Sequence, residues 1–262
     1  MAGAGKFEAL TRIGFAARGI MYLLIGWLAL RSGRTEDGPG IIDYVGSGGG
    51  RLLLAAMAVG FLAYGAWRAA DAWTDSSGRG SDAKGLAVRT GGIVSGFLHL
   101  GLGLIAAMHA AAAGTRGGGD SAREGAAAAL DLPGGSLILL LAAAGLLLTS
   151  LFQLRQAWTL AFMDRLGGRG GSAGWVCWLG RAGYAARGIV FIVIAWFFWR
   201  AGSEQSSAEA GGLGAALDSL PDTLRMAVAG GLALFGLFSL VEARYRRIDA
   251  PHLPHSLRPG PR

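Results

Sequence analysis

The chain has 262 residues, of which 52% are hydrophobic and 16% are charged, and 46 more are glycine. Soluble domains average roughly 25% charged residues, so this composition excludes an ordinary soluble domain and also a disordered chain. The single cysteine excludes a disulfide framework and a paired-cysteine metal or redox site. The class that remains is a polytopic membrane protein.

Six segments are apolar enough to cross a bilayer as α-helices, which takes about 20 residues at roughly 1.5 Å each. In chain order they are residues 13–30, 52–70, 93–113, 136–154, 182–199 and 226–241. Transmembrane β-strands alternate polar and apolar residues over about 10 positions, whereas these runs are continuous. Because the first run recurs later in the chain, we interpret it as a retained span rather than a signal peptide. The sequence predicts an all-α bundle of six transmembrane helices.

Positive charge is distributed unevenly about the six spans. An even number of spans puts both termini on one side of the membrane. Seven of the 24 Lys and Arg residues lie on the side of the membrane opposite the termini. The other 17 lie in the segments on the termini side or just inside the membrane there. Because cytoplasmic segments carry the excess of Lys and Arg, we expect both termini in the cytoplasm and the chain in a bacterial cytoplasmic membrane. The net charge of +7 then reflects orientation and attraction to anionic lipid, and we expect no nucleic-acid partner.

The chain repeats one two-helix unit three times. Residues 12–22 match 181–191 at an offset of 169, and residues 89–99 form a weaker copy at an offset of 77. The second helices also align at two small-residue positions and one polar position: Gly60, Gly145 and Gly231; Gly65, Ser150 and Gly236; Asp71, Gln156 and Glu242. The unit is predicted to be a helical hairpin.

We divide a single transmembrane domain, 1–262, into repeat one at 12–75, repeat two at 89–160 and repeat three at 181–247. The remainder, 248–262, is predicted to be a flexible cytoplasmic tail. Because each repeat enters the membrane from the same side, the three copies predict a pseudo-three-fold axis along the membrane normal.

The motif Arg-x-Gly-[Phe/Tyr]-Ala-Ala-Arg-Gly-Ile opens the first helix of repeats one and three, and Val-Glu-Ala-Arg-Tyr-Arg-Arg ends the last span. This pattern resembles a bacterial family catalogued as domain of unknown function 1206. The resemblance covers nearly the whole chain and implies three tandem pairs of transmembrane helices, without an established activity. Repeat two departs from the motif, which leaves its role open.

Charged residues lie about one turn inside the membrane in repeats one and three. Arg18 and Arg187 are near the start of the first helix, and Asp71 and Glu242 are near the end of the second. In repeat two both positions are uncharged: Ser95 and Gln156. We therefore predict two ion pairs within repeats, Arg18 with Asp71 and Arg187 with Glu242. A pair that holds the hairpin together, simple snorkelling, and an ion or substrate gate are the three interpretations.

Repeat two carries polar residues at membrane depth. His99 lies one turn deeper than Ser95, and the second helix contributes Thr149, Ser150 and Gln153. Ionisable groups inside a membrane are functional candidates by default, and histidine can relay protons near neutral pH. The alternative interpretation is a neutral histidine that forms a hydrogen bond between helices.

The sequence contains no recognisable catalytic motif, metal-ligand cluster or phosphate-binding loop. We therefore expect no enzyme activity, cofactor or bound metal. Two main function classes remain, and a lipid-modifying enzyme is a third, weaker alternative. The first is a structural or partner-binding membrane subunit, in contact with the bilayer and with another membrane protein or a second copy. The second is a protein that binds or conducts a small solute, ion or proton around repeat two. A polar cavity reaching His99 would favour the second class, and a dry core would favour the first.

Overall fold

The computed structural model describes residues 2–33, 35–75, 78–111, 121–168 and 173–247. Its regular structure is helical, with no strand in these ranges beyond a single bridge between Leu166 and Arg246. Six helices are long and apolar enough to cross a membrane: α1 (Ala2–Ser32), α3 (Arg51–Thr74), α4 (Ala83–Ala110), α6 (Gly135–Thr159), α7 (Gly174–Glu204) and α9 (Asp222–Tyr245). The predicted all-α, six-span membrane protein is confirmed.

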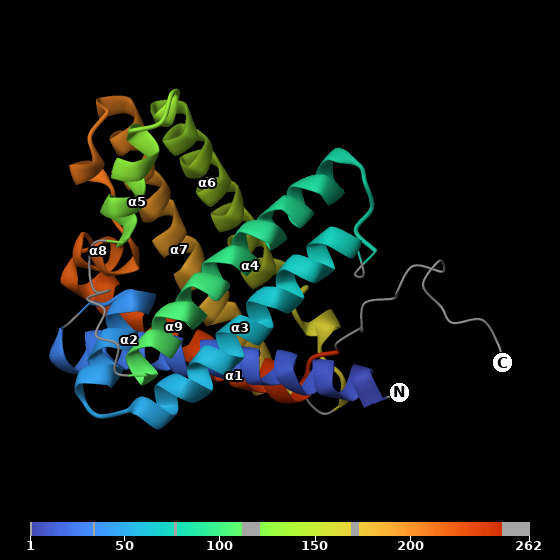
Figure 1. The fold of residues 1–262 in the computed structure, drawn as a ribbon. Helices are drawn as coiled ribbons and strands as arrows, with labels where there is room; N and C mark the ends of the chain where they lie inside the picture. The colour runs from blue at the N-terminus through green and yellow to red at the C-terminus, as the bar shows by residue number, and fades with distance from the viewer. Residues whose placement is uncertain (1, 34, 76–77, 112–120, 169–172, 248–262) are drawn as a thin grey trace.

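Two predicted segments lie partly or wholly outside the described residues. The apolar run predicts a third span that reaches residue 113, but α4 ends at Ala110 and residues 112–113 lie outside the described ranges. The predicted tail, 248–262, lies outside them as well. The start of α1 and the end of α9 lie at the same end of the bundle (Figure 1), which we call the termini side.

Short helices cover the opposite end of the bundle, in the connections between the two long helices of each repeat (Figure 1). They are α2 (Gly38–Ser47), α5 (Ser121–Leu130) and α8 (Leu213–Asp218). The first of them starts where Asp37 accepts a hydrogen bond of 2.9 Å from the Gly40 N–H, with Pro39 in its first turn. Its apolar residues Ile41 and Ile42 are fully buried, so α2 closes the bundle rather than extending into solvent.

The most extensive helix contacts join neighbouring repeats rather than the two helices of one repeat. They are α3 with α4, α6 with α7, and α1 with α9. Figure 1 shows α3 running beside α4 and α6 beside α7. Short connections favour antiparallel neighbours, and the first two pairs are joined by the shortest links between long helices. Within repeats, α1 packs on α3 and α7 on α9, but α4 and α6 make no extensive contact. The expectation that every repeat is a closed hairpin is therefore wrong for repeat two.

Small residues make these contacts between repeats possible. A Cβ atom on Gly19 would lie 2.9 Å from the carbonyl oxygen of Gly236, and one on Gly96 would lie 2.9 Å from that of Gly65. At the third equivalent contact, the Ser150 hydroxyl donates a 2.8 Å hydrogen bond to the Gly188 carbonyl. The first helix of each repeat thus packs on the second helix of the preceding one, in cyclic order. This order supports the pseudo-three-fold axis, which stays a prediction.

The core is apolar and rich in aromatic residues, and it lies mainly among α1, α3, α7 and α9. Phe61, Phe235 and Phe238 are fully buried in it. The apolar stretch of α1 is 61% buried, whereas those of α4 and α6 are each 22% buried. Repeat two is therefore the part of the bundle with the largest surface left to lipid or to a partner.

Candidate functional site

Three arginines at equivalent positions cap the helix ends on the termini side. Arg12 donates hydrogen bonds of 2.8 Å to the carbonyl oxygens of Ala243 and Arg244, at the end of α9. Arg89 binds the end of α3 through the Ala72 carbonyl at 2.7 Å, and Arg181 binds the end of α6 at 3.1 Å. The last carbonyls of a helix lack partners within it and attract cations. These bonds therefore lock each helix pair in the same cyclic order as the glycine contacts.

One turn deeper, Arg18 lies in a fully partnered site between α1 and α9. Its guanidinium donates to the Glu242 carboxylate, to the Ser239 hydroxyl at 3.3 Å and to the Tyr64 hydroxyl at 3.3 Å. Glu242 is buried and accepts a second hydrogen bond from Arg246. The predicted pairing of Arg18 with Asp71 inside repeat one is therefore wrong: the carboxylate comes from repeat three.

Asp71 is also buried, but its cationic neighbours come from its own repeat and the loop that follows. The nearest guanidinium nitrogens of Arg68 and Arg79 each lie 3.8 Å from its carboxylate. The helix that packs against this part of α3 is α4, and α4 carries Ser95 at the position equivalent to Arg18. Asp71 thus has two longer contacts with arginines, whereas Glu242 forms a short ion pair with Arg18.

Arg187, the equivalent of Arg18 in repeat three, lies among aromatic rings. Its guanidinium carbon is 4.5 Å from the ring centre of Phe235, 5.2 Å from that of Phe191 and 5.3 Å from that of Tyr22. When the amide of Gln153 turns its oxygen toward Arg187, that oxygen accepts from both terminal nitrogens at 3.3 Å. Cation–π contacts stabilise a desolvated guanidinium, so Arg187 is held without a carboxylate.

The predicted pairing of Arg187 with Glu242 is wrong as well, since Glu242 binds Arg18 and Arg246. Two buried atoms beside the α6–α7 pair have no hydrogen-bond partner among the described residues, the Nε of Arg187 and the Oε1 of Gln156. The physical reason is the cyclic packing. The two helices of repeat two belong to different helix pairs. Ser95 on α4 therefore leaves the α3–α4 interface without an arginine, and Gln156 on α6 leaves the α6–α7 interface without an acid.

The structure does not bring the five predicted polar residues together. The Nδ1–H of His99 on α4 donates one hydrogen bond to the Ser95 carbonyl of its own helix, at 2.7 Å, and the His99 ring centre lies 4.6 Å from that of Tyr64. Ser150 and Gln153 on α6 instead face α7. Thr149 is exposed and donates to the Gly145 carbonyl of its own helix at 2.8 Å.

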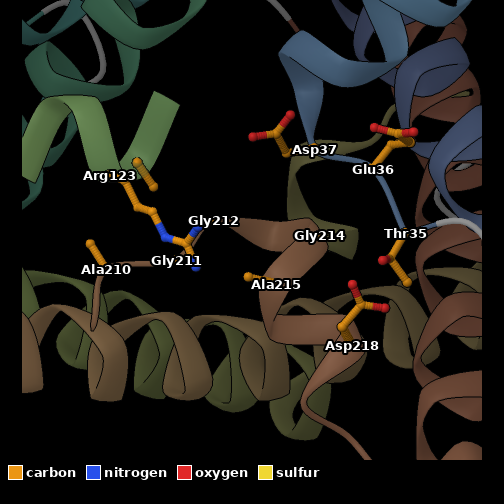
Figure 2. A pocket seen from close by; sticks show the side chains of 11 residues that line it. Thr35, Glu36, Asp37, Arg123, Ala210, Gly211, Gly212, Gly214, Ala215 and Asp218 are labelled. Carbon is orange, nitrogen blue, oxygen red and sulfur yellow. The ribbon is translucent and has the colours of Figure 1, made fainter. Parts of the chain in front are cut away.

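A cavity of about 180 Å³ at the opposite end of the molecule had no signal in the sequence. Segments of all three repeats line it, namely 35–37, 122–123 and 210–218. Figure 2 shows the Arg123 side chain extending toward Gly211 and Gly212, with Asp218 on the far side. Its residues are dispersed along the chain in glycine-rich connections, which is why no spacing pattern reveals it. It does not include His99, and within the described ranges no group of three or more His, Cys, Asp or Glu residues could hold a metal.

The repeated architecture agrees with a known protein family. The family described as Domain of Unknown Function (DUF1206) matches the chain over residues 13–75, 90–160 and 182–246. The chain belongs to this family. Each matched segment holds both long helices of one repeat, so three tandem units are shown. A relative, the "Uncharacterized protein YxxB" of Bacillus subtilis (strain 168), is 26% identical over 250 residues, covering 90% of each chain. No solved structure matches this chain.

Proposed function

We propose that this protein is a membrane subunit that binds a transmembrane helix of another membrane protein between α4 and α6 of repeat two. The observation that carries the proposal is a pair of glycine positions that form close contacts between the two long helices in repeats one and three but not in repeat two. The proposal involves no catalytic step.

In repeats one and three these glycines form close helix contacts. A Cβ atom on Gly14 would lie 2.8 Å from the Gly60 carbonyl oxygen, which joins α1 to α3. One on Gly231 would lie 2.6 Å from the Cβ of Ala186, which joins α9 to α7. Small residues allow this approach because nothing keeps the backbones apart.

Gly91 and Gly145 are the equivalent residues of repeat two, and both are exposed. A Cβ on either would meet no described atom within 4 Å. The axes of α4 and α6 run in different directions (Figure 1), and the two helices make no extensive contact. One turn beyond Gly145, Thr149 is exposed, whereas the equivalent residues of the other repeats, Tyr64 and Phe235, are buried. The surfaces around Gly91 and Gly145 thus carry the residue type that forms helix contacts in the other repeats, but no described helix packs on them. This arrangement favours a partner helix.

The surroundings of His99 support a binding subunit over a conducting protein. The residues around it are aromatic, including Phe61 at 6.1 Å between ring centres, and the cavities of about 180 and 440 Å³ are lined by other residues. Ion or proton binding around repeat two is the second candidate. The buried Nε of Arg187 and Oε1 of Gln156 favour it, since neither has a partner among the described residues.

Photo-crosslinking in native membranes tests the partner. A photoreactive amino acid at Thr149 should crosslink one membrane protein, identified by mass spectrometry, whereas the same amino acid at Val59, exposed on α3, should not. Gly91→Leu should abolish the Thr149 product by filling the contact surface. Gly101→Leu is the matched control, because Gly101 is exposed on the same helix and a Cβ there would meet no described atom within 4 Å.

Three outcomes would overturn the proposal. They are lipid adducts alone at Thr149, identical products at Thr149 and Val59, and a crosslinked dimer of this chain, which would replace the partner by a second copy. Loss of the product in Gly101→Leu as much as in Gly91→Leu would also count against it.

We further propose that the termini side faces the cytoplasm of a bacterial cell, which the excess of arginine on that side supports. Ser81 and Ser47 are exposed on opposite ends of the bundle. In a Cys177→Ala background, a membrane-impermeant maleimide should label Ser47→Cys in intact spheroplasts and label Ser81→Cys only after permeabilisation. The reverse labelling order would invert the orientation.

A further inference from the structure

A cavity of about 440 Å³ lies on the outside of repeat three, between α7 and α9 at the termini side. Its walls are almost entirely apolar: Trp175, Leu179, Leu237, Leu240 and Val241, with Arg244 and Tyr245 at its end. The groove opens outward, since Trp175 is 59% exposed and Leu237 is 40% exposed. From Leu237 to Tyr245 the helix rises about 12 Å at roughly 1.5 Å per residue. The groove therefore begins at the membrane surface and runs into the hydrocarbon.

Arg244 places a positive charge at the surface end of this groove. Its guanidinium lies 5.9 Å from the ring centre of Tyr245, and in the described part of the chain no carboxylate lies within ion-pair distance of it. The nearby Glu242 carboxylate is buried and bound by Arg18 and Arg246. The charge of Arg244 is thus free for a ligand that approaches from the bilayer.

We propose that this groove binds one anionic glycerophospholipid, with an acyl chain along Leu237 and Leu240 and its phosphate at Arg244. Arginines at the surface ends of transmembrane helices attract anionic headgroups, and Trp175 lies at the depth where tryptophan borders the headgroups. The volume falls within the roughly 300–1,000 Å³ of small-molecule sites. The site is separate from the α4–α6 surfaces and does not depend on the proposed function.

The composition of the groove favours a lipid chain over a helix. Helix contacts in membranes use small residues, as at Gly14 and Gly231, whereas this groove is walled by leucines with flexible side chains. The equivalent positions of repeat one are alanines, Ala66 and Ala69, and Trp73 stands in the place of Arg244. In repeat two the equivalent positions are leucines, Leu151 and Leu154, but Trp158 stands in the place of Arg244. The terminal arginine is therefore a property of repeat three.

Native mass spectrometry of the purified full-length protein, titrated with phosphatidylglycerol or phosphatidylcholine, tests the site. We expect one tightly bound phosphatidylglycerol and about fivefold weaker phosphatidylcholine, since one arginine near the surface contributes roughly 1 kcal/mol. Arg244→Gln should remove that preference. Arg51→Gln, which changes an exposed arginine at the opposite end of the bundle, should keep it.

A second variant separates the groove from the charge. Leu237→Trp fills the groove and leaves Arg244 in place, so it should weaken both lipids alike; an unchanged melting temperature shows that the variant is folded. Equal binding of the two lipids by the native protein would overturn the proposal. So would an unchanged lipid preference in Arg244→Gln, or unchanged lipid binding in a folded Leu237→Trp variant.

Discussion

Arg18 and Arg187 occupy equivalent positions in the first helices of repeats one and three, yet their surroundings differ. Arg18 binds a buried carboxylate, a hydroxyl and a phenol. Arg187 lies over three aromatic rings and beside an amide. The difference arises because each arginine lies on a helix that packs against the second helix of the preceding repeat in the cyclic order, and only one of those helices provides an acid there.

The comparison shows that equivalent residues of a repeat protein can have partners of different chemistry. Repeat two lacks both charges, but its helices α4 and α6 belong to different pairs, so the two losses fall in different places. Asp71 compensates with Arg68 and Arg79 at 3.8 Å, and Arg187 compensates with cation–π contacts. Substitutions can test each half of this interpretation.

The largest effect is expected at the Arg18–Glu242 pair. Glu242→Leu leaves the buried Arg18 without its carboxylate, and removing one partner of a buried pair costs about 3–5 kcal/mol. Arg18→Met combined with Glu242→Leu should restore much of this loss, as measured by a double-mutant cycle of unfolding in micelles. A cycle between Arg18 and Asp71 should be additive; strong coupling there would reinstate a pair inside repeat one.

A smaller effect is expected at the glycine contacts. Gly183→Leu forces a side chain against Phe235, whose Cβ would lie 2.6 Å from the new Cβ, so we expect a destabilisation of about 1–3 kcal/mol. Gly91→Leu points into open space and should change the unfolding free energy by less than about 0.5 kcal/mol. Comparable losses at Gly183 and Gly91 would mean that α4 and α6 close on each other in the membrane.

Supplying the missing acid sharpens the comparison further. Gln156 stands where Glu242 stands in repeat three, on the helix that packs against Arg187. Gln156→Glu should be tolerated in the native chain but not in an Arg187→Met background, with a coupling energy of about 1–2 kcal/mol in a thermal-unfolding cycle. Additive effects would show that the two positions do not meet.

The smallest effect concerns the loop that brings Arg79 to Asp71. Asp75, outside the membrane, accepts hydrogen bonds from the backbone N–H groups of Arg79 and Gly80 at 2.7 and 2.8 Å. These bonds hold the pKa of Asp75 below its usual 3.8. The charged form is thus favoured by folding, and its contribution is present at neutral pH and is lost as pH falls through the lowered pKa.

Asp75→Asn should therefore melt slightly below the native protein at pH 7, and the difference should shrink below about pH 4. Asparagine tolerates the left-handed conformation of Asp75, with φ of 52°, so the substitution tests the charge rather than the backbone. A difference that persists at low pH would assign the effect to something other than the carboxylate.

Much of the fold was predictable. The six apolar runs, the offset of 169 and the register of Gly60, Gly145 and Gly231 identified six helices in three copies. The simultaneous loss of charge at Ser95 and Gln156 also pointed to the right positions, but to the wrong partners. Internal similarity says which residues are equivalent and not which copy touches which. The short links after α3 and α6 were the available signal, since short connections favour antiparallel neighbours.

The sequence by itself determined that the chain is a six-span, three-repeat membrane protein, because the length and apolarity of each run are local properties. The tertiary structure alone decided that Arg18 meets Glu242, that His99 and Ser150 lie in different interfaces, and that Gly91 faces open space. Those facts depend on which helices of different repeats pack together. The sequence of a helix does not show whether its contacts come from its own repeat or from another one.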